Sequence, residues 1–228
     1  LYIYDNANTS TPSETIEMQP ADGGTWTASL SPVPYGKFYT FSIQQDGKWL
    51  AETPGIWAKA VGVNGHRAAI IDFAATDPEG WKADKGPATK AITDAVLYEM
   101  HHRDFSVHPS SGITNKGKFL ALTEQATRSI LGDKTGIDHL KELGVTHVHI
   151  LPSYDYNSVD ETQAPLNQYN WGYDPQNYNA PEGSYSSRPA DPSARIAEMK
   201  QMVKALHDAG IGVVMDVVYN LSLIHISE

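Results

Sequence analysis

Residues 135–151 read TGIDHLKELGVTHVHIL and decide the fold class. The first ten predict a short helix, because Thr135 and Asp138 have the spacing of a capping box and Gly144 follows the last apolar position. The remaining seven, which begin at Val145, form a mostly apolar run that is typical of a buried strand. A helix that leads directly into such a strand indicates parallel βαβ units.

The same pattern continues on both sides of this stretch. Residues 95–100 (AVLYEM) predict an earlier strand, and residues 211–218 (IGVVMDVV) predict a later one. Between them, Asp191 and Pro192 form a helix start, with an acceptor at the N-cap and proline at the first helical position. The helix ends before Gly210, and a loop of about 40 residues separates it from the second strand.

Three parallel strands with a long loop are compatible with a (β/α)₈ barrel or with a doubly wound sheet. A complete barrel needs about 250 residues, so the barrel interpretation predicts an incomplete TIM-type barrel with its first three β/α units. A doubly wound nucleotide-binding sheet is disfavoured, because no Gly-x-Gly-x-x-Gly pattern opens either helix.

The first 75 residues have a different pattern. Short alternating stretches at 26–30 and 38–43 and a last strand at 69–73 predict a small all-β, immunoglobulin-like sandwich, with Asp46-Gly47 as a hairpin turn. In the stretch 38–43, Tyr39, Phe41 and Ile43 share one face. Residues 76–93 are rich in turn-forming residues and predict a linker. The chain is therefore predicted to be multidomain, with barrel units over residues 94–220.

Composition limits the partners. The 228 residues carry a formal net charge of −10, which argues against nucleic acid, and contain no run of about 18 apolar residues that would cross a membrane. Cysteine is absent, which leaves the cellular compartment open. The chain has 12 tyrosines and 5 tryptophans but is only 19% charged, a combination that suits neutral sugars.

Two stretches in the long loop are the most specific. Residues 169–175 read YNWGYDP and residues 181–186 read PEGSYS. The heptapeptide resembles the signature of type I pullulanases, the α-1,6-debranching members of the α-amylase superfamily. Further agreement comes, in order, from AVGVNG (60–65), ATDPEGW (75–81), LYEMH (97–101), TGIDHLKELG (135–144) and DVVYN (216–220). The resemblance covers roughly residues 20–220.

The resemblance implies a substrate-binding set of Tyr173, Asp174, Asp216 and Asn220. In the family, the tyrosine that corresponds to Tyr173 lies under the sugar at the cleavage site. Asp174 is expected to contact substrate or to cap a turn. The aspartate that corresponds to Asp216 orients an arginine on the fourth strand, and the asparagine that corresponds to Asn220 holds the local loop. Trp171 is expected to pack in the core of the loop.

No catalytic residue is assigned within this chain. Retaining glycoside hydrolysis needs two carboxyl groups about 5–5.5 Å apart, and the resemblance places them on the fourth and fifth strands. No metal ligand and no cofactor are predicted, and calcium in the intact enzyme is left open. His147 and His149 share a strand face and are expected to pack in the barrel wall, whereas His101 and His102 are expected to be mainly structural.

The resemblance implies a fragment of a glycoside hydrolase that cleaves α-1,6 branches in pullulan or starch dextrins, with no activity of its own. One alternative is a fragment of an isoamylase or a glucan branching enzyme. Another is a non-catalytic α-glucan-binding module, for which Trp26, Tyr35 and Trp49 are the candidate exposed aromatics. In each case the expected partner is an α-glucan.

The match ends abruptly at residues 221–228, which read LSLIHISE. Leu221 stands where the family has a histidine that contacts substrate. The resemblance therefore predicts that residues 221–228 form a non-native tail.

Overall fold

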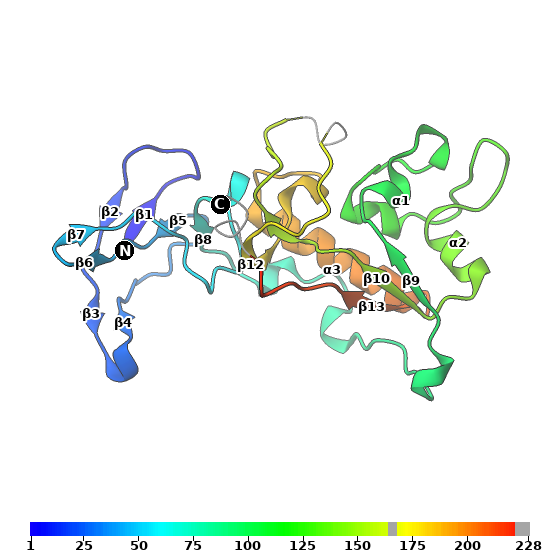
Figure 1. Cartoon of the computed structure of the whole chain (residues 1–228), viewed down its shortest axis with the longest axis horizontal. Helices are drawn as coiled ribbons and strands as arrows, with labels where there is room; N and C mark the ends of the chain where they lie inside the picture. The colour runs from blue at the N-terminus through cyan, green and yellow to red at the C-terminus, as the bar shows by residue number, and fades with distance from the viewer. Residues whose placement is uncertain (164–167, 222–228) are drawn as a thin grey trace.

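The computed structural model describes residues 1–163 and 168–221. The molecule is elongated, with the N-terminal strands at one end and a parallel sheet with its helices at the other (Figure 1). Of the predicted non-native tail, Leu221 is described and the rest lies outside the described residues.

Eight short strands make up the N-terminal part. They are β1 (Tyr2–Tyr4), β2 (Glu14–Thr15), β3 (Gln19–Pro20), β4 (Trp26–Thr27), β5 (Phe38–Thr40), β6 (Gln44–Gln45), β7 (Lys48–Trp49) and β8 (Ala68–Ala69).

These strands form a four-stranded sheet of order β2-β1-β5-β8 and the two-stranded ribbons β3-β4 and β6-β7, with every pair antiparallel. The β6-β7 ribbon turns at Asp46 and Gly47, whose φ angles are 50° and 74°, so the predicted hairpin is confirmed. The immunoglobulin-like sandwich itself stays a prediction.

Two details of this sheet differ from the sequence-based expectation. The buried side chains of β5 are Phe38 and Thr40, whereas Ile43 is exposed. Thr40 is buried without penalty because its hydroxyl donates to the carboxylate of Glu52. The last strand is also shorter than predicted, since β8 ends at Ala69 and a 3₁₀ turn begins at Ala74.

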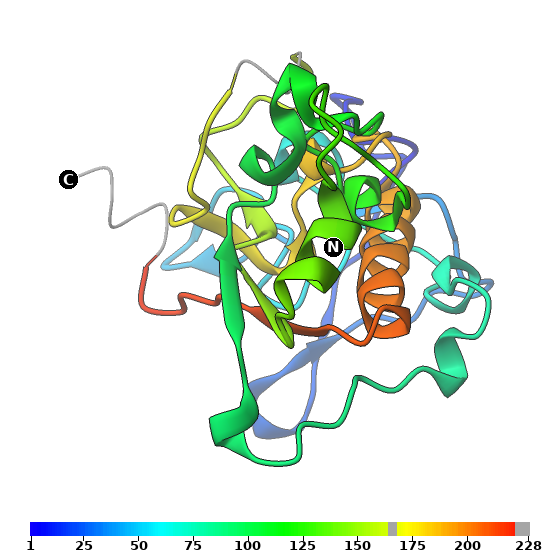
Figure 2. The same ribbon diagram turned by 90° about the vertical axis from the view of Figure 1, so that its right-hand side faces the viewer.

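The parallel sheet confirms the βαβ prediction. Its strands are β9 (Leu97–Met100), β10 (His147–Ile150) and β13 (Gly212–Met215), in the order β13-β10-β9 with both pairs parallel. The predicted third strand is longer than the observed β13. Helices α2 (Gly136–Leu143) and α3 (Pro192–Asp208) lie on the same side of the sheet (Figure 2).

The main core lies between this sheet and its helices. It includes Val148 and Ile150 from β10, Leu140 from α2, and Met202 and Leu206 from α3. The stretch after β9 also contains regular structure. It contains the short helix α1 (Asp104–Val107) and a 3₁₀ turn that adds Phe119 and Leu122 to the same core, because these two apolar side chains are fully buried.

The long loop after β10 also contains regular structure. Strands β11 (Tyr154–Tyr156) and β12 (Pro175–Pro181) pair in antiparallel fashion, with register shifts on both sides of Asp155. The sequence predicted only a loop of about 40 residues here and did not reveal this strand pair.

Helix α3 joins the two ends of the molecule. Its Ile196 packs with Tyr4, Phe38 and Ala60 of the N-terminal part. Its Lys200 donates from Nζ to a carboxylate oxygen of Asp77 at 2.6 Å. Within the described residues, no helix is long and apolar enough to cross a membrane.

Candidate functional site

Two of the predicted site residues meet at the end of β13. Asp216 follows this strand directly, and its N–H donates to the carbonyl of Ile150 at 3.0 Å. The hydroxyl of Tyr173 donates to Oδ2 of Asp216 at 2.7 Å. Burial, then the bond to Asp216, raises the pKa of Tyr173 to about 12, so its hydroxyl remains a donor at neutral pH. The contact lies at the carboxyl end of the parallel strands, where ligands bind in such sheets.

The YNWGYDP loop is held by its own side chains. Oδ1 of Asn170 accepts from the N–H of Gly172 at 2.7 Å, and Nδ2 of Asn170 donates to Oδ1 of Asp174 at 2.8 Å. Gly172 has φ +89°, and a Cβ there would lie 2.6 Å from the carbonyl oxygen of Pro152. Only glycine fits this close approach.

The other two predicted site residues lie apart from this contact. Asp174 is buried, and its Oδ2 accepts from both the N–H (2.9 Å) and the hydroxyl of Ser158. With Asn170 on Oδ1, both oxygens of Asp174 are bonded within the loop. Asn220 is exposed to solvent farther along the chain.

Phenol rings surround Asp216. The hydroxyl of Tyr154 is buried and makes no hydrogen bond among the described residues. Burial, then the charge of Asp216, raises the pKa of Tyr154. The Tyr154 ring centroid lies 6.0 Å from that of Tyr178. Two tyrosines, Tyr173 and Tyr154, therefore lie close enough to Asp216 to interact with it.

An open pocket lies in the YNWGYDP loop. It is lined by Ser158, Tyr169, Asn170, Trp171, Tyr173 and Asp174. The prediction that Trp171 packs in the loop core was wrong, because the side chain is 60% exposed. Since Gly172 closes the turn against Pro152, Trp171 is left on the outside of the loop.

His101 supports this pocket from β9. Its Nε2 lies 2.8 Å from the carbonyl oxygen of Asn170, and its ring is 4.9 Å from that of Tyr169. The guanidinium of Arg103 lies 5.9 Å from the same tyrosine ring. The mainly structural role expected for His101 is therefore one of holding the loop. Its neighbour His102 is fully buried against Phe119.

His147 and His149 lie on the sheet face away from the helices. Nδ1 of His149 is 3.6 Å from a carboxylate oxygen of Glu99, its partner on β9. His147 lies over Gly212, where a Cβ would come within 2.4 Å of the imidazole ring. Both histidines thus contact the neighbouring strand.

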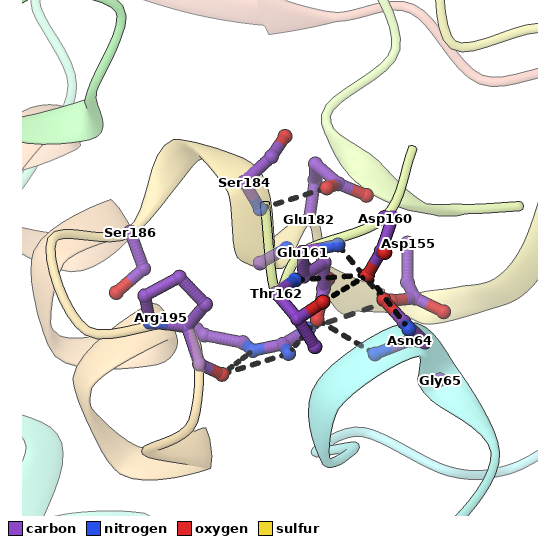
Figure 3. Close-up of polar contacts among 12 residues, drawn as sticks. Asn64, Gly65, Asp155, Asp160, Glu161, Thr162, Glu182, Ser184, Ser186 and Arg195 are labelled. Atoms are coloured by element: carbon purple, nitrogen blue, oxygen red, sulfur yellow. Dashed lines mark hydrogen bonds and ion pairs between the residues drawn. The ribbon is translucent and has the colours of Figure 1, made fainter. Parts of the chain in front are cut away.

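A second polar centre contains none of the predicted site residues. Figure 3 shows Arg195 of α3 among acidic side chains, with Asn64 of the N-terminal part on the other side. Ligand-type oxygens of Asp155, Glu161 and Glu182, here called the buried acidic cluster, lie within 4.8 Å of one another. Arg195 pairs with Glu161 and, at 3.4 Å, with Asp155.

The side chains of this cluster do not fit a cation site. Carboxylate oxygens are the donors that calcium prefers, but the Arg195 guanidinium lies among them and already supplies positive charge. A Cβ at Gly183 would come within 2.3 Å of its Cζ, so the space is filled. The arrangement is an ion-pair network between Arg195 and the acids.

The network sets three carboxyl groups against one guanidinium. Burial is the largest cause that raises the pKa of both Asp155 and Glu182, and the neighbouring Glu161 adds to it. Glu182 accepts from the N–H groups of Tyr156 (3.1 Å) and Ser184 (2.8 Å). These bonds fix the ends of β11 and β12.

Sequence reasoning missed the cluster, Arg195 and the support from His101. The three acids are separated in sequence by residues of a loop, where charges are usually solvated, and no periodic pattern connects them. In the structure, Tyr154, Asp155 and Tyr156 are buried in succession, which shows that both faces of this strand are covered.

Comparison with known proteins gives the family. The family model for the alpha amylase catalytic domain matches residues 71–227 of this chain. The chain belongs to the alpha-amylase family. Within it, the chain is similar to pullulanases, as its YNWGYDP loop predicts. The pullulanase of Bacillus subtilis (strain 168) is 44% identical over 206 residues, which is 90% of this chain.

Solved structures agree. The crystal structure of the pullulanase from Paenibacillus barengoltzii in complex with maltohexaose and α-cyclodextrin matches with a TM-score of 0.94 and 49% identity over 97% of this chain. The pullulanase from Bacillus acidopullulyticus matches with a TM-score of 0.92 and 44% identity, also over 97%. The chain spans 28% of the B. subtilis relative and 34% and 27% of these two solved chains.

Proposed function

We propose that this chain is the α-glucan-binding portion of a debranching glycosidase that hydrolyses α-1,6-glucosidic branches with retention. The contact between Tyr173 and Asp216 at the carboxyl end of the parallel strands carries the proposal. An aromatic ring anchored at its hydroxyl by a carboxylate presents its face to a pyranose, which buries apolar area without requiring charge. Maltooligosaccharides in the solved relatives support an α-glucan as the ligand.

In this proposal Tyr173 is the sugar platform and Asp216 organises the pocket. Asp174 acts through the loop geometry, and Asn220 holds the segment after β13. Neutral sugars are the partners, with neither nucleic acid nor membrane involved, in keeping with the net charge of −10. The finer fold assignment, an immunoglobulin-like sandwich over residues 1–75, a linker over 76–93 and three barrel units over 94–220, belongs to the same proposal.

The chain is proposed to lack hydrolytic activity of its own. The resemblance assigns the nucleophile and the acid/base to the fourth and fifth strands, whereas the described residues form three parallel strands. In the part of the chain that the structure describes, the acids that gather within 4.8 Å are buried with Arg195, where no substrate reaches them.

Calorimetric titration of the full chain with maltohexaose tests the proposal. Wild type and Tyr173→Phe are expected to bind, because both keep the ring, and Tyr173→Ala is expected to bind at least about tenfold more weakly. Reducing-sugar release from pullulan is expected to be absent. If Tyr173→Ala binds maltohexaose as tightly as wild type, the proposed binding site is wrong. If the chain hydrolyses pullulan, the proposed lack of activity is wrong.

One observation favours a second candidate, a glycan-binding role for the N-terminal ribbons. Trp26, Tyr35 and Trp49 are 61%, 59% and 66% exposed. Affinity electrophoresis in a gel that contains glycogen separates the two candidates. If the N-terminal ribbons bind glycogen, Trp26→Ala is slowed less by the glycogen than wild type is.

A further inference from the structure

The pocket in the YNWGYDP loop has an unusual polar lining, because its polar side chains are already bonded to one another. Asn170 bonds to Gly172 and Asp174, and Ser158 bonds to Asp174. The carbonyl of Asn170 faces His101 at 2.8 Å. A ligand in this pocket therefore finds few free donors or acceptors on these side chains, so the rings are what the pocket offers.

Three rings line the pocket, namely Tyr169, Trp171 and Tyr173. Tyr173 is fixed by its bond to Asp216, and Tyr169 is held against the ring of His101. Trp171 is 60% exposed. An exposed indole costs solvation free energy unless something covers it, and indole is the largest stacking surface that a side chain provides.

The backbone fixes where Trp171 lies relative to Tyr173. Gly172 separates them at φ +89° and is pressed against Pro152, so the turn has little freedom. The bond between Asn170 and Asp174 closes the loop on the other side. Both rings are thus presented by one rigid turn, which lowers the entropic cost of binding a ligand that spans them.

We propose that Trp171, supported by Tyr169, is a second stacking platform that binds a glucosyl unit adjacent to the one on Tyr173. The inference rests on the proposed function, since it takes the α-glucan as its ligand. The affinity of the YNWGYDP loop then depends on the length of the glucan, because a ligand that covers both platforms binds more tightly than one that covers Tyr173 alone. An ionic ligand is disfavoured, because the charge of Asp174 is bonded within the loop.

The experiment compares glucose, which can cover only one platform, with maltotetraose by calorimetric titration of the full chain. In wild type, maltotetraose is expected to bind more tightly than glucose. In Trp171→Ala this advantage is expected to fall by about fivefold or more, whereas Trp171→Phe retains most of it because a ring remains. Trp57→Ala is the matched control, since Trp57 is also highly exposed, at 78%, but lies in the N-terminal part.

The outcomes separate this inference from the proposed function. If Tyr173→Ala loses binding while Trp171→Ala binds both sugars like wild type, the second platform is overturned and the proposed function stands. If wild type binds neither sugar, both are overturned. Equal thermal unfolding midpoints of Trp171→Ala and wild type show that any loss of binding comes from the platform and not from unfolding. A Trp171→Phe variant that binds as weakly as Trp171→Ala overturns the inference, because a ring remains in that variant.

Discussion

His102 is a buried histidine among aromatic rings. Its ring lies 5.1 Å from that of Phe119 and 4.8 Å from that of Tyr185, and neither ring nitrogen has a hydrogen-bond partner among the described residues. Burial is the largest cause that lowers the pKa of His102 to about 4. The imidazole is therefore neutral in the folded chain, and its protonation favours unfolding.

Replacing His102 by valine is expected to remove an acid sensitivity. The unfolded chain takes up this proton near pH 6.5 and the folded chain near pH 4, so the wild type loses stability as pH falls through that window. The loss is on the order of 3 kcal/mol. Urea unfolding from pH 7 to pH 4 measures it. His66→Val, at an exposed position, is the control and keeps the wild-type slope; an unchanged slope in His102→Val would contradict the assignment.

At the scale of elements, the YNWGYDP loop depends on one glycine. Gly172→Ala is expected to destabilise the chain by more than Gly132→Ala. Both have left-handed φ values, +89° and +92°, and share a cost of about 1–2 kcal/mol. At Gly172 the added Cβ also lies 2.6 Å from the Pro152 carbonyl, whereas nothing lies within 4 Å at Gly132.

Denaturant midpoints and maltotetraose titration check this pair. Gly172→Ala should lower the midpoint further and weaken binding, since the loop must move away from Pro152. Gly132→Ala should leave binding unchanged. Equal midpoints for the two variants would show that the loop yields without cost.

Periodic elements could be predicted from the sequence, and the irregular ones could not. The helix that ends at Gly144 and the apolar strands show their periods directly, and α3 shows its start at Asp191, which accepts from the N–H of Ser193 at 3.0 Å. The β11-β12 ribbon has register shifts and two buried tyrosines with a buried acid between them, so no simple alternation revealed it.

Distant pairings decide the rest of the site. The family resemblance predicted Tyr173 and Asp216 as two individual site residues. Their direct bond depends on how the loop folds back on β13, which the sequence does not show. Trp171 was misplaced for the same reason: its exposure follows from the tight contact of Gly172 with Pro152, which is a tertiary feature.

At the scale of the whole molecule, the buried acidic cluster makes stability depend on pH in the opposite sense to His102. Burial raises the pKa of Glu182, and Glu161 and Asp155 raise it further. The folded chain therefore holds this proton more tightly than the unfolded chain. The contribution of Glu182 to the free energy of unfolding is complete at acid pH, below the pKa that this group has in the unfolded chain. It is lost as the pH rises toward the raised pKa of the folded chain.

Glu182→Gln is expected to flatten this alkaline loss, because glutamine cannot ionise. The measurement is the slope of unfolding free energy against pH from 5 to 9, which is insensitive to any constant cost of the substitution. Glu142→Gln, at the exposed ion pair with Lys134, is the control and should keep the wild-type slope. A wild-type slope in Glu182→Gln would show that this carboxyl is not the group that titrates.

The turn at Asn64 has a consequence for how the two ends of the molecule are aligned. Its N–H donates to a carboxylate oxygen of Glu161 and its Oδ1 accepts from the N–H of the same residue, both at 2.8 Å, while Gly65 accepts from Asn177. These reciprocal bonds act together with Ile196, which packs on the N-terminal sheet, and with the bond between Lys200 and Asp77 of the connecting chain. Loss of any one of these contacts therefore leaves the others to keep the two ends aligned.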